Sequence, residues 1–243
     1  MTGAMRIGIL EAGRPAPDLA AKHGDYRRMF RDLLGPALPE AEFVDYAAID
    51  GHLPTRPDAA DAWLVTGSAY SVYDPDPWIG ALKRFVREAV NRGVPVFGIC
   101  FGHQLIAEVM GGKVEKAAQG WGVGVHRYAV AEAADWMVGA EAGAELATLV
   151  SHQDQVVRPP PGARLLAASA FCPYAMLEIG PKLATLQSHP EMPAAYCADL
   201  YESRRERIGG ARVDAAIASL SDEIHAARAA EWIAAFYRRA LAA

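Results

Sequence analysis

The chain has 243 residues, with 24 Lys and Arg against 29 Asp and Glu and a formal net charge of −5. This length is near the upper limit for one hydrophobic core, and a content of 52% hydrophobic and 22% charged residues excludes disordered, collagen-like and coiled-coil chains. The sequence also shows no basic stripe of the kind that neutralises phosphates, so we expect no nucleic-acid partner.

The N-terminus lacks the features of a signal peptide, and no window approaches the roughly 18 apolar residues of a membrane-spanning helix. We therefore expect a cytoplasmic protein with no membrane partner. Cys100, Cys172 and Cys197 lack the paired spacing of a disulfide framework or a zinc site, which fits a reducing compartment. We expect no metal and no organic cofactor, and one of the three cysteines can be a reactive thiol.

The first 110 residues alternate between apolar runs and helical patterns. Short apolar runs bounded by turn residues predict strands at 5–11, about 42–49, 62–66 and 94–99. Helical spacing predicts helices at 26–34 with Asp25 as N-cap, from Asp76-Pro77 to Gly93 with Asp76 as N-cap, and at 101–110. Because these strands are apolar on both faces, the order predicts an α/β fold with a mostly parallel central sheet and helices on both faces.

The second half of the chain has a different pattern. Short β-like segments at 120–130, 164–168 and 183–187 either extend the sheet or form an antiparallel flap. Helical patterns return at 194–208 and at about 222–241, the latter with Ser221 as N-cap. No linker separates these parts, so we expect a domain at 1–193 and a helical C-terminal extension at 194–243 packed on the same domain.

Cys100 is the strongest candidate for a nucleophile. It lies where the strand at 94–99 meets the next helix, between Gly98 and Gly102. A tight strand-to-helix turn exposes its central side chain above the sheet and leaves little room for Cβ atoms on either side. The helix N-terminus favours the thiolate, and the N–H of Phe101 would face a developing oxyanion. The alternative interpretation is a small buried hydrophobic residue.

The segment Ser188-His189-Pro190-Glu191 supplies the partners that a cysteine nucleophile needs. A thiolate that attacks acyl groups requires a histidine base, and that base is oriented by a carboxylate. Since side chains alternate along a strand, His189 and Glu191 are predicted to share one face, where Glu191 can hold the far nitrogen of the ring.

The pattern Gly98-x-Cys100-x-Gly102-x-Gln104, with the distant His189-Pro190-Glu191, resembles the class I, triad-type glutamine amidotransferases. The resemblance covers residues 5–193 and is greatest to stand-alone proteins similar to the glutaminase domain of GMP synthetase. It implies a flavodoxin-like fold, attack of Cys100 on the side-chain amide of glutamine, proton transfer by His189 and orientation of His189 by Glu191.

The resemblance also implies an oxyanion hole and a glutamine pocket. Segment 66–69 (Thr-Gly-Ser-Ala) matches the family's second oxyanion turn, commonly Ser-Gly-Gly-Pro, so either Gly67 or Ser68 is the second donor beside Phe101. Segment 150–156 matches the pocket wall. The substrate-binding residues implied are Gln104, Ser151, His152 and Gln153. His152 is a rival base, but we prefer His189 because only His189 has a carboxylate two residues further on.

These observations predict a glutaminase that forms a γ-glutamyl thioester on Cys100 and releases ammonia. Only about 50 residues follow Pro193, too few for a synthase domain of usual size, so an acceptor enzyme would be a separate chain. Two alternatives stay open. One is a γ-glutamyl peptidase that acts on glutathione-like compounds, and the other is a non-catalytic binding module that retains the fold.

Overall fold

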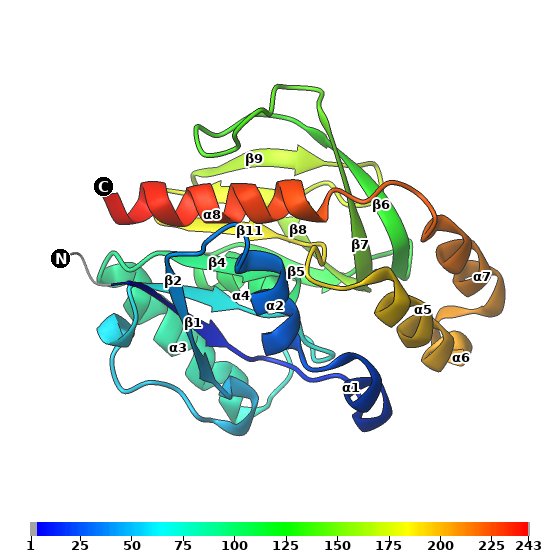
Figure 1. The fold of residues 1–243 in the computed structure, drawn as a ribbon, viewed down its shortest axis with the longest axis horizontal. Coiled ribbons are helices and arrows are strands. Elements are labelled where there is room, and N and C mark those ends of the chain that lie inside the picture. Colours follow the sequence, from blue (N-terminus) through cyan, green and yellow to red (C-terminus); the bar gives the residue numbers. More distant parts are fainter. Residues whose placement is uncertain (1–3, 243) are drawn as a thin grey trace.

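A nine-stranded sheet runs through the centre of the computed structural model, which describes residues 4–242 (Figure 1). Its strand order is β2-β1-β3-β4-β11-β10-β9-β6-β7. The parallel half comprises β1 (Met5–Leu10), β2 (Ala41–Tyr46), β3 (Ala62–Val65), β4 (Val96–Ile99) and β11 (Leu183–Leu186). The antiparallel half comprises β10 (Met176–Ile179), β9 (Ala163–Ala168), β6 (Gly122–Val130) and β7 (Glu145–His152). The predicted α/β fold is confirmed, and five of the nine strands form the parallel part of its central sheet.

Two layers of helices cover the sheet, because alternate residues of each buried strand point to opposite faces. On β3, Leu64 packs into the core under α2 (Tyr26–Leu34) and α8 (Ala226–Ala242). Its neighbour Trp63 packs into the core under α3 (Pro77–Asn91) and α4 (Phe101–Val109). Because β1, β3, β4 and β11 run parallel to one another, their carboxyl ends meet at one edge of the sheet. Ligands bind at this edge in open α/β sheets.

The β-like segments predicted at 120–130, 164–168 and 183–187 all lie in the main sheet, as β6, β9 and β11. Strands β6, β7, β9 and β10 extend the main sheet, whereas β5 (Lys113–Lys116) and β8 (Asp154–Arg158) form a separate antiparallel pair. At the other end of the chain, α5 (Ala194–Ser203), α6 (Arg205–Ile208) and α7 (Gly210–Ser219) lie beside β6 and β7 (Figure 1).

Several local predictions were wrong. Ser221 does not cap a helix, because Ser221 Oγ donates to the carbonyl of Ala218 and α8 begins only at Ala226. The residues before α8 extend along β7 instead, where the His225 N–H donates to Ala147 O at 2.7 Å. Asp76 precedes α3 but makes no side-chain cap bond. The prediction also missed α7 and α1 (Pro17–His23).

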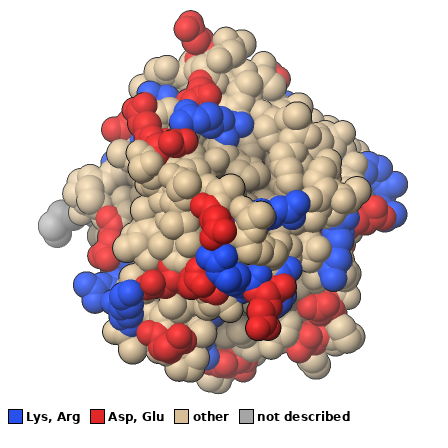
Figure 2. Space-filling model, turned by 90° about the vertical axis from the view of Figure 1, so that its right-hand side faces the viewer, with Lys and Arg blue, Asp and Glu red and all other residues tan. Residues whose placement is uncertain are grey.

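The charge distribution on the surface and the character of the helices agree with the composition of the chain. On the face shown in Figure 2, basic and acidic side chains are interspersed rather than gathered in one basic stripe. Within residues 4–242, no helix has the length and the apolar character needed to cross a bilayer.

Candidate active site

Cys100 lies at a strained turn between β4 and α4. Its φ of 50° makes it the one non-glycine residue in the left-handed region within the described chain, a conformation that costs about 1–3 kcal/mol. Cβ atoms at the flanking glycines would clash with backbone: one at Gly98 would lie 2.5 Å from Gly102 C, and one at Gly102 would lie 2.4 Å from Val65 O. These close approaches explain why both positions are glycine.

His189 and Glu191 form a buried hydrogen-bonded pair, with 2.7 Å between His189 Nδ1 and Glu191 Oε1. Strand β11 ends at Leu186, so the two residues lie on a turn beyond the strand. The predicted strand alternation was therefore wrong as the reason for their pairing. A backbone bond from the His189 N–H to Leu149 O, at 2.8 Å, anchors this turn to β7.

The charge state of His189 depends on its neighbours. Burial disfavours the charged ring, but the interactions with Cys100 and Glu191 outweigh burial and raise the pKa of His189 to about 10. A protonated imidazole between a thiolate and a carboxylate can give its proton to a leaving group.

The His189 ring packs against the backbone of Gly67. The imidazole lies so close to the backbone of Gly67 that a Cβ there would be 2.5 Å from His189 Cε1. The carbonyl of Gly67 accepts a hydrogen bond from Thr66 Oγ1 at 3.1 Å. Because the peptide bond is planar and trans, the N–H of Ser68 points in the opposite direction from this carbonyl within the same peptide plane. Ser68 lines the cavity beside Cys100.

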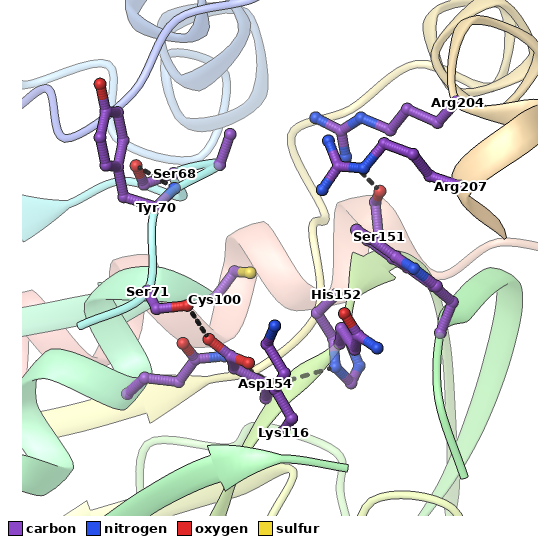
Figure 3. Close-up of a pocket in the computed structure, with 14 residues that line it drawn as sticks. Ser68, Tyr70, Ser71, Cys100, Lys116, Ser151, His152, Asp154, Arg204 and Arg207 are labelled. Atoms are coloured by element: carbon purple, nitrogen blue, oxygen red, sulfur yellow. Dashed lines mark hydrogen bonds between the residues drawn. The ribbon is translucent and has the colours of Figure 1, made fainter. Parts of the chain in front are cut away.

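A cavity of about 110 Å³ opens over Cys100 (Figure 3). Of the predicted site residues, the cavity is lined by Cys100, Ser68, Gln104, Ser151, His152 and Gln153. The other predicted site residues, Gly67, Phe101, His189 and Glu191, do not line it. The Phe101 ring is buried and stacks on Trp78 with 5.6 Å between ring centroids. Its N–H is the first of α4 and has no acceptor within the helix.

Gln187 was missed in the sequence. Its Nε2 lies 3.5 Å from Cys100 Sγ, and its Oε1 accepts a hydrogen bond from Gln104 Nε2 at 3.1 Å. Gln104 Nε2 also donates to the backbone carbonyl of Asp154 at 2.8 Å. The amide nitrogen of Gln104 is thus engaged within the protein. The position of Gln187, two residues before His189 on the same turn, was the available signal.

His152, the rival base, has different surroundings. Burial lowers its pKa to about 3, so the ring is neutral at physiological pH. Its Nδ1 lies 3.2 Å from the backbone carbonyl of Asp154, and it has no carboxylate within salt-bridge distance in the described part of the chain. His152 therefore forms part of the wall, whereas His189 has the acidic partner.

Further polar residues of the cavity were also missed. Asp154 accepts hydrogen bonds from Ser71 Oγ and, at 3.0 Å, from Tyr73 OH. Lys116, Arg204 and Arg207 complete the cavity wall. No group of three or more His, Cys, Asp or Glu residues within 4–242 is arranged to hold a metal ion.

Comparisons with known proteins agree with one another. The family model described as glutamine amidotransferase class-I matches residues 44–195. Gamma-glutamyl peptidase 3 of Arabidopsis thaliana is 33% identical over 176 residues, which cover 70% of each chain. A glutamine-hydrolyzing GMP synthase of Streptococcus mutans is 34% identical over 173 residues, which cover 69% of this chain and 32% of the synthase. A glutamine amidotransferase structure from Thermotoga maritima covers 99% of each chain with a TM-score of 0.76 at 16% identity, which shows a shared fold.

Proposed function

Since the chain belongs to the class-I glutamine amidotransferase family, we propose that it is a cysteine amidohydrolase that cleaves the γ-amide of a glutamyl substrate through a thioester on Cys100. One observation carries the proposal. The only non-glycine residue with a positive φ in the described chain is a cysteine that lines a cavity, next to an imidazole that a buried carboxylate holds. This is the arrangement that nucleophilic acyl transfer requires.

In the first half-reaction, the Cys100 thiolate attacks the γ-carbonyl carbon and a C–S bond forms. The N–H groups of Phe101 and Ser68 stabilise the negative charge that develops on the carbonyl oxygen. The C–N bond then breaks, and His189 gives its proton to the departing nitrogen. Glu191 keeps the imidazole oriented throughout.

In the second half-reaction, water attacks the thioester carbonyl carbon and His189 accepts one of its protons. The C–S bond breaks, so that the thiolate and the imidazolium are restored. The γ-carboxylic acid of glutamate leaves and ionises in water. Both half-reactions use the same oxyanion donors.

The leaving nitrogen distinguishes two candidate substrates. With glutamine it is ammonia, which a separate synthase subunit would consume, as the similarity to one third of a GMP synthase suggests. With a γ-glutamyl peptide it is the amine of an amino acid. The second candidate is favoured by the gamma-glutamyl peptidases of Arabidopsis thaliana, since the similarity to peptidase 3 covers 70% of both proteins.

Covalent labelling tests the proposal. A diazo-ketone analogue of glutamine should alkylate Cys100 and spare Cys172 and Cys197, because burial raises the pKa of each of those two thiols to about 12. Cys100→Ser should abolish labelling and lower kcat by at least about 10³-fold, with unchanged circular dichroism. If Cys100 stays unlabelled and neither glutamine nor γ-glutamyl dipeptides are hydrolysed, the chain is a binding module.

A further inference from the structure

Three cationic side chains line the same cavity as Cys100 without an acidic partner. Lys116, Arg204 and Arg207 all contribute to its wall, and within residues 4–242 none of them has a carboxylate oxygen within the 4.0 Å of a salt bridge. Arg204 Nη1 donates to the neutral Ser151 Oγ at 3.0 Å. The guanidinium of Arg207 lies over the Trp121 ring, 5.5 Å from its centroid. Figure 3 shows both arginine side chains above Ser151.

Arg205, which lies between these two arginines in the sequence, is paired with acidic residues. Arg205 forms salt bridges with Glu202 at 2.7 Å and with Asp214 at 2.8 Å, away from the cavity. Arg204 lies at the turn between α5 and α6, and Arg207 lies in α6. Both line the cavity, whereas Arg205 does not. The available acidic residues of α5 to α7 therefore leave the two cavity-lining arginines unpaired.

The charges of the cavity exceed what glutamine can neutralise. Against the three cations stand the Asp154 carboxylate and the Cys100 thiolate of the proposed mechanism, which leaves one positive charge in excess. His152 is neutral because burial lowers its pKa to about 3. Glutamine carries one ammonium and one carboxylate, so its net charge is zero. A γ-glutamyl amino acid carries a second carboxylate on its leaving amine, which gives the substrate a net negative charge that complements this wall.

We propose that Arg204 and Arg207 bind the carboxylate of the leaving amine, and that the preferred substrates are γ-glutamyl amides of amino acids or short peptides rather than free glutamine. The inference rests on the proposed function, because it places the scissile γ-amide at Cys100. Arginine suits this role since its planar fork of N–H donors matches a carboxylate. Both arginines lie outside the segment 44–195 that the family model matches, so the subsite is a feature of the C-terminal helices.

A matched pair of substrates tests the subsite in the unmodified protein. γ-Glutamylglycine and its C-terminal amide present the same scissile bond and nearly the same size, and they differ in the charge of the leaving amine. We expect kcat/KM to be about 10- to 100-fold higher for the acid, the range of a hydrogen bond to a charged group, with the difference mainly in KM. Equal values within twofold would overturn the proposal.

Substitutions identify the groups responsible. Arg204→Gln and Arg207→Gln should each lower the acid-to-amide ratio of kcat/KM toward 1, whereas the control Arg205→Gln should keep the ratio of the unmodified protein. If Arg204→Gln and Arg207→Gln lower kcat/KM equally for the acid and the amide, the arginines bind the glutamyl portion and the proposal is wrong.

A binding measurement separates this inference from the proposed function. Calorimetric titration of Cys100→Ser with the two compounds compares their affinities without turnover. Tighter binding of the acid would uphold the subsite even if the unmodified protein proved inactive, which would overturn only the enzymatic function. Equal binding of the acid and the amide, together with turnover by the unmodified protein, would uphold the enzymatic function and overturn the subsite.

Discussion

At the residue scale, the surroundings of each cysteine decide its chemistry. Cys172 and Cys197 are buried in apolar surroundings that raise the pKa of each thiol to about 12. Cys100 is also buried, at 3% exposure, but it lies against a cavity and beside His189. Its backbone strain is tolerated because β4 and α4 are buried on both sides of the turn.

Glu191 is expected to act through His189 as a positioning residue. Glu191→Gln removes one of the negative charges that raise the pKa of His189, so the imidazolium loses its proton at a lower pH. We expect kcat to fall by about 10²-fold or more and the alkaline limb of the kcat/KM profile to move to lower pH. An unmoved limb in the pH-rate profile would contradict this role.

Gly67 is expected to control the position of the imidazole. In Gly67→Ala, the new Cβ would lie 2.5 Å from His189 Cε1, so the ring must shift. A displacement of this kind costs on the order of 10²-fold in kcat. Gly80→Ala in α3 is the matched control, because its Cβ meets only the flexible end of Arg84 at 3.5 Å. Steady-state kinetics of both variants check the prediction, and comparable losses in the two would contradict it.

At the element scale, one buried carboxylate ties α8 to the sheet. Glu178 on β10 accepts hydrogen bonds from Trp136 Nε1 and Arg239 Nη2, each at 2.7 Å, and from Arg164. Its side chain is 4% exposed. A buried charge needs all of its partners, since each lost donor leaves it without the water that it gave up on folding.

Neighbouring arginines of α8 allow a matched comparison. Arg239→Ala removes a donor from buried Glu178 and should lower the free energy of unfolding by about 1.5–3 kcal/mol. Arg238→Ala removes an ion pair with the exposed Glu40 and should cost no more than about 1 kcal/mol. Urea unfolding midpoints measure both. A midpoint for Arg238→Ala as low as that for Arg239→Ala would contradict the argument.

At the scale of the whole molecule, the C-terminal helices cover the sheet. Trp232, Phe236 and Tyr237 of α8 are buried in the same core as Phe97 of β4, and the Phe97 and Phe236 rings lie 5.5 Å apart. Tyr237 OH donates to Trp63 O at 3.0 Å. We therefore propose that residues 194–243 fold together with residues 1–193 as one cooperative unit.

Truncation tests this unit. A fragment of residues 1–193 would expose the apolar face under α8, so we expect it to aggregate or to lack a cooperative unfolding transition. The full chain should unfold in one transition, with coincident midpoints by tryptophan fluorescence and far-UV circular dichroism. A soluble fragment with a sharp transition of its own would show two independent domains.

Local patterns predicted much of the fold. The strands of the parallel half were predicted within three residues of their observed ends, and Asp25 caps α2 as expected by accepting from the Arg28 N–H. The flavodoxin-like architecture is confirmed by the structural comparison. The helix α7 and the start of α8 were not predicted, because pairing of His225 with β7 is a long-range contact that no local pattern records.

The sequence by itself determined the order of buried strands and helices and the glycine-flanked cysteine at one strand end, because hydrophobic period and glycine sterics act between near neighbours. It also predicted the roles of Cys100, His189 and Glu191, which the labelling and pH experiments test. Only the tertiary structure decided that the His189 ring packs against Gly67 and that Gln187 Nε2 contacts Cys100 Sγ. It also decided that Arg204 and Arg207 line the same cavity as Cys100. These contacts join residues about 90 to 120 positions apart, and the packing of the whole sheet sets their distances.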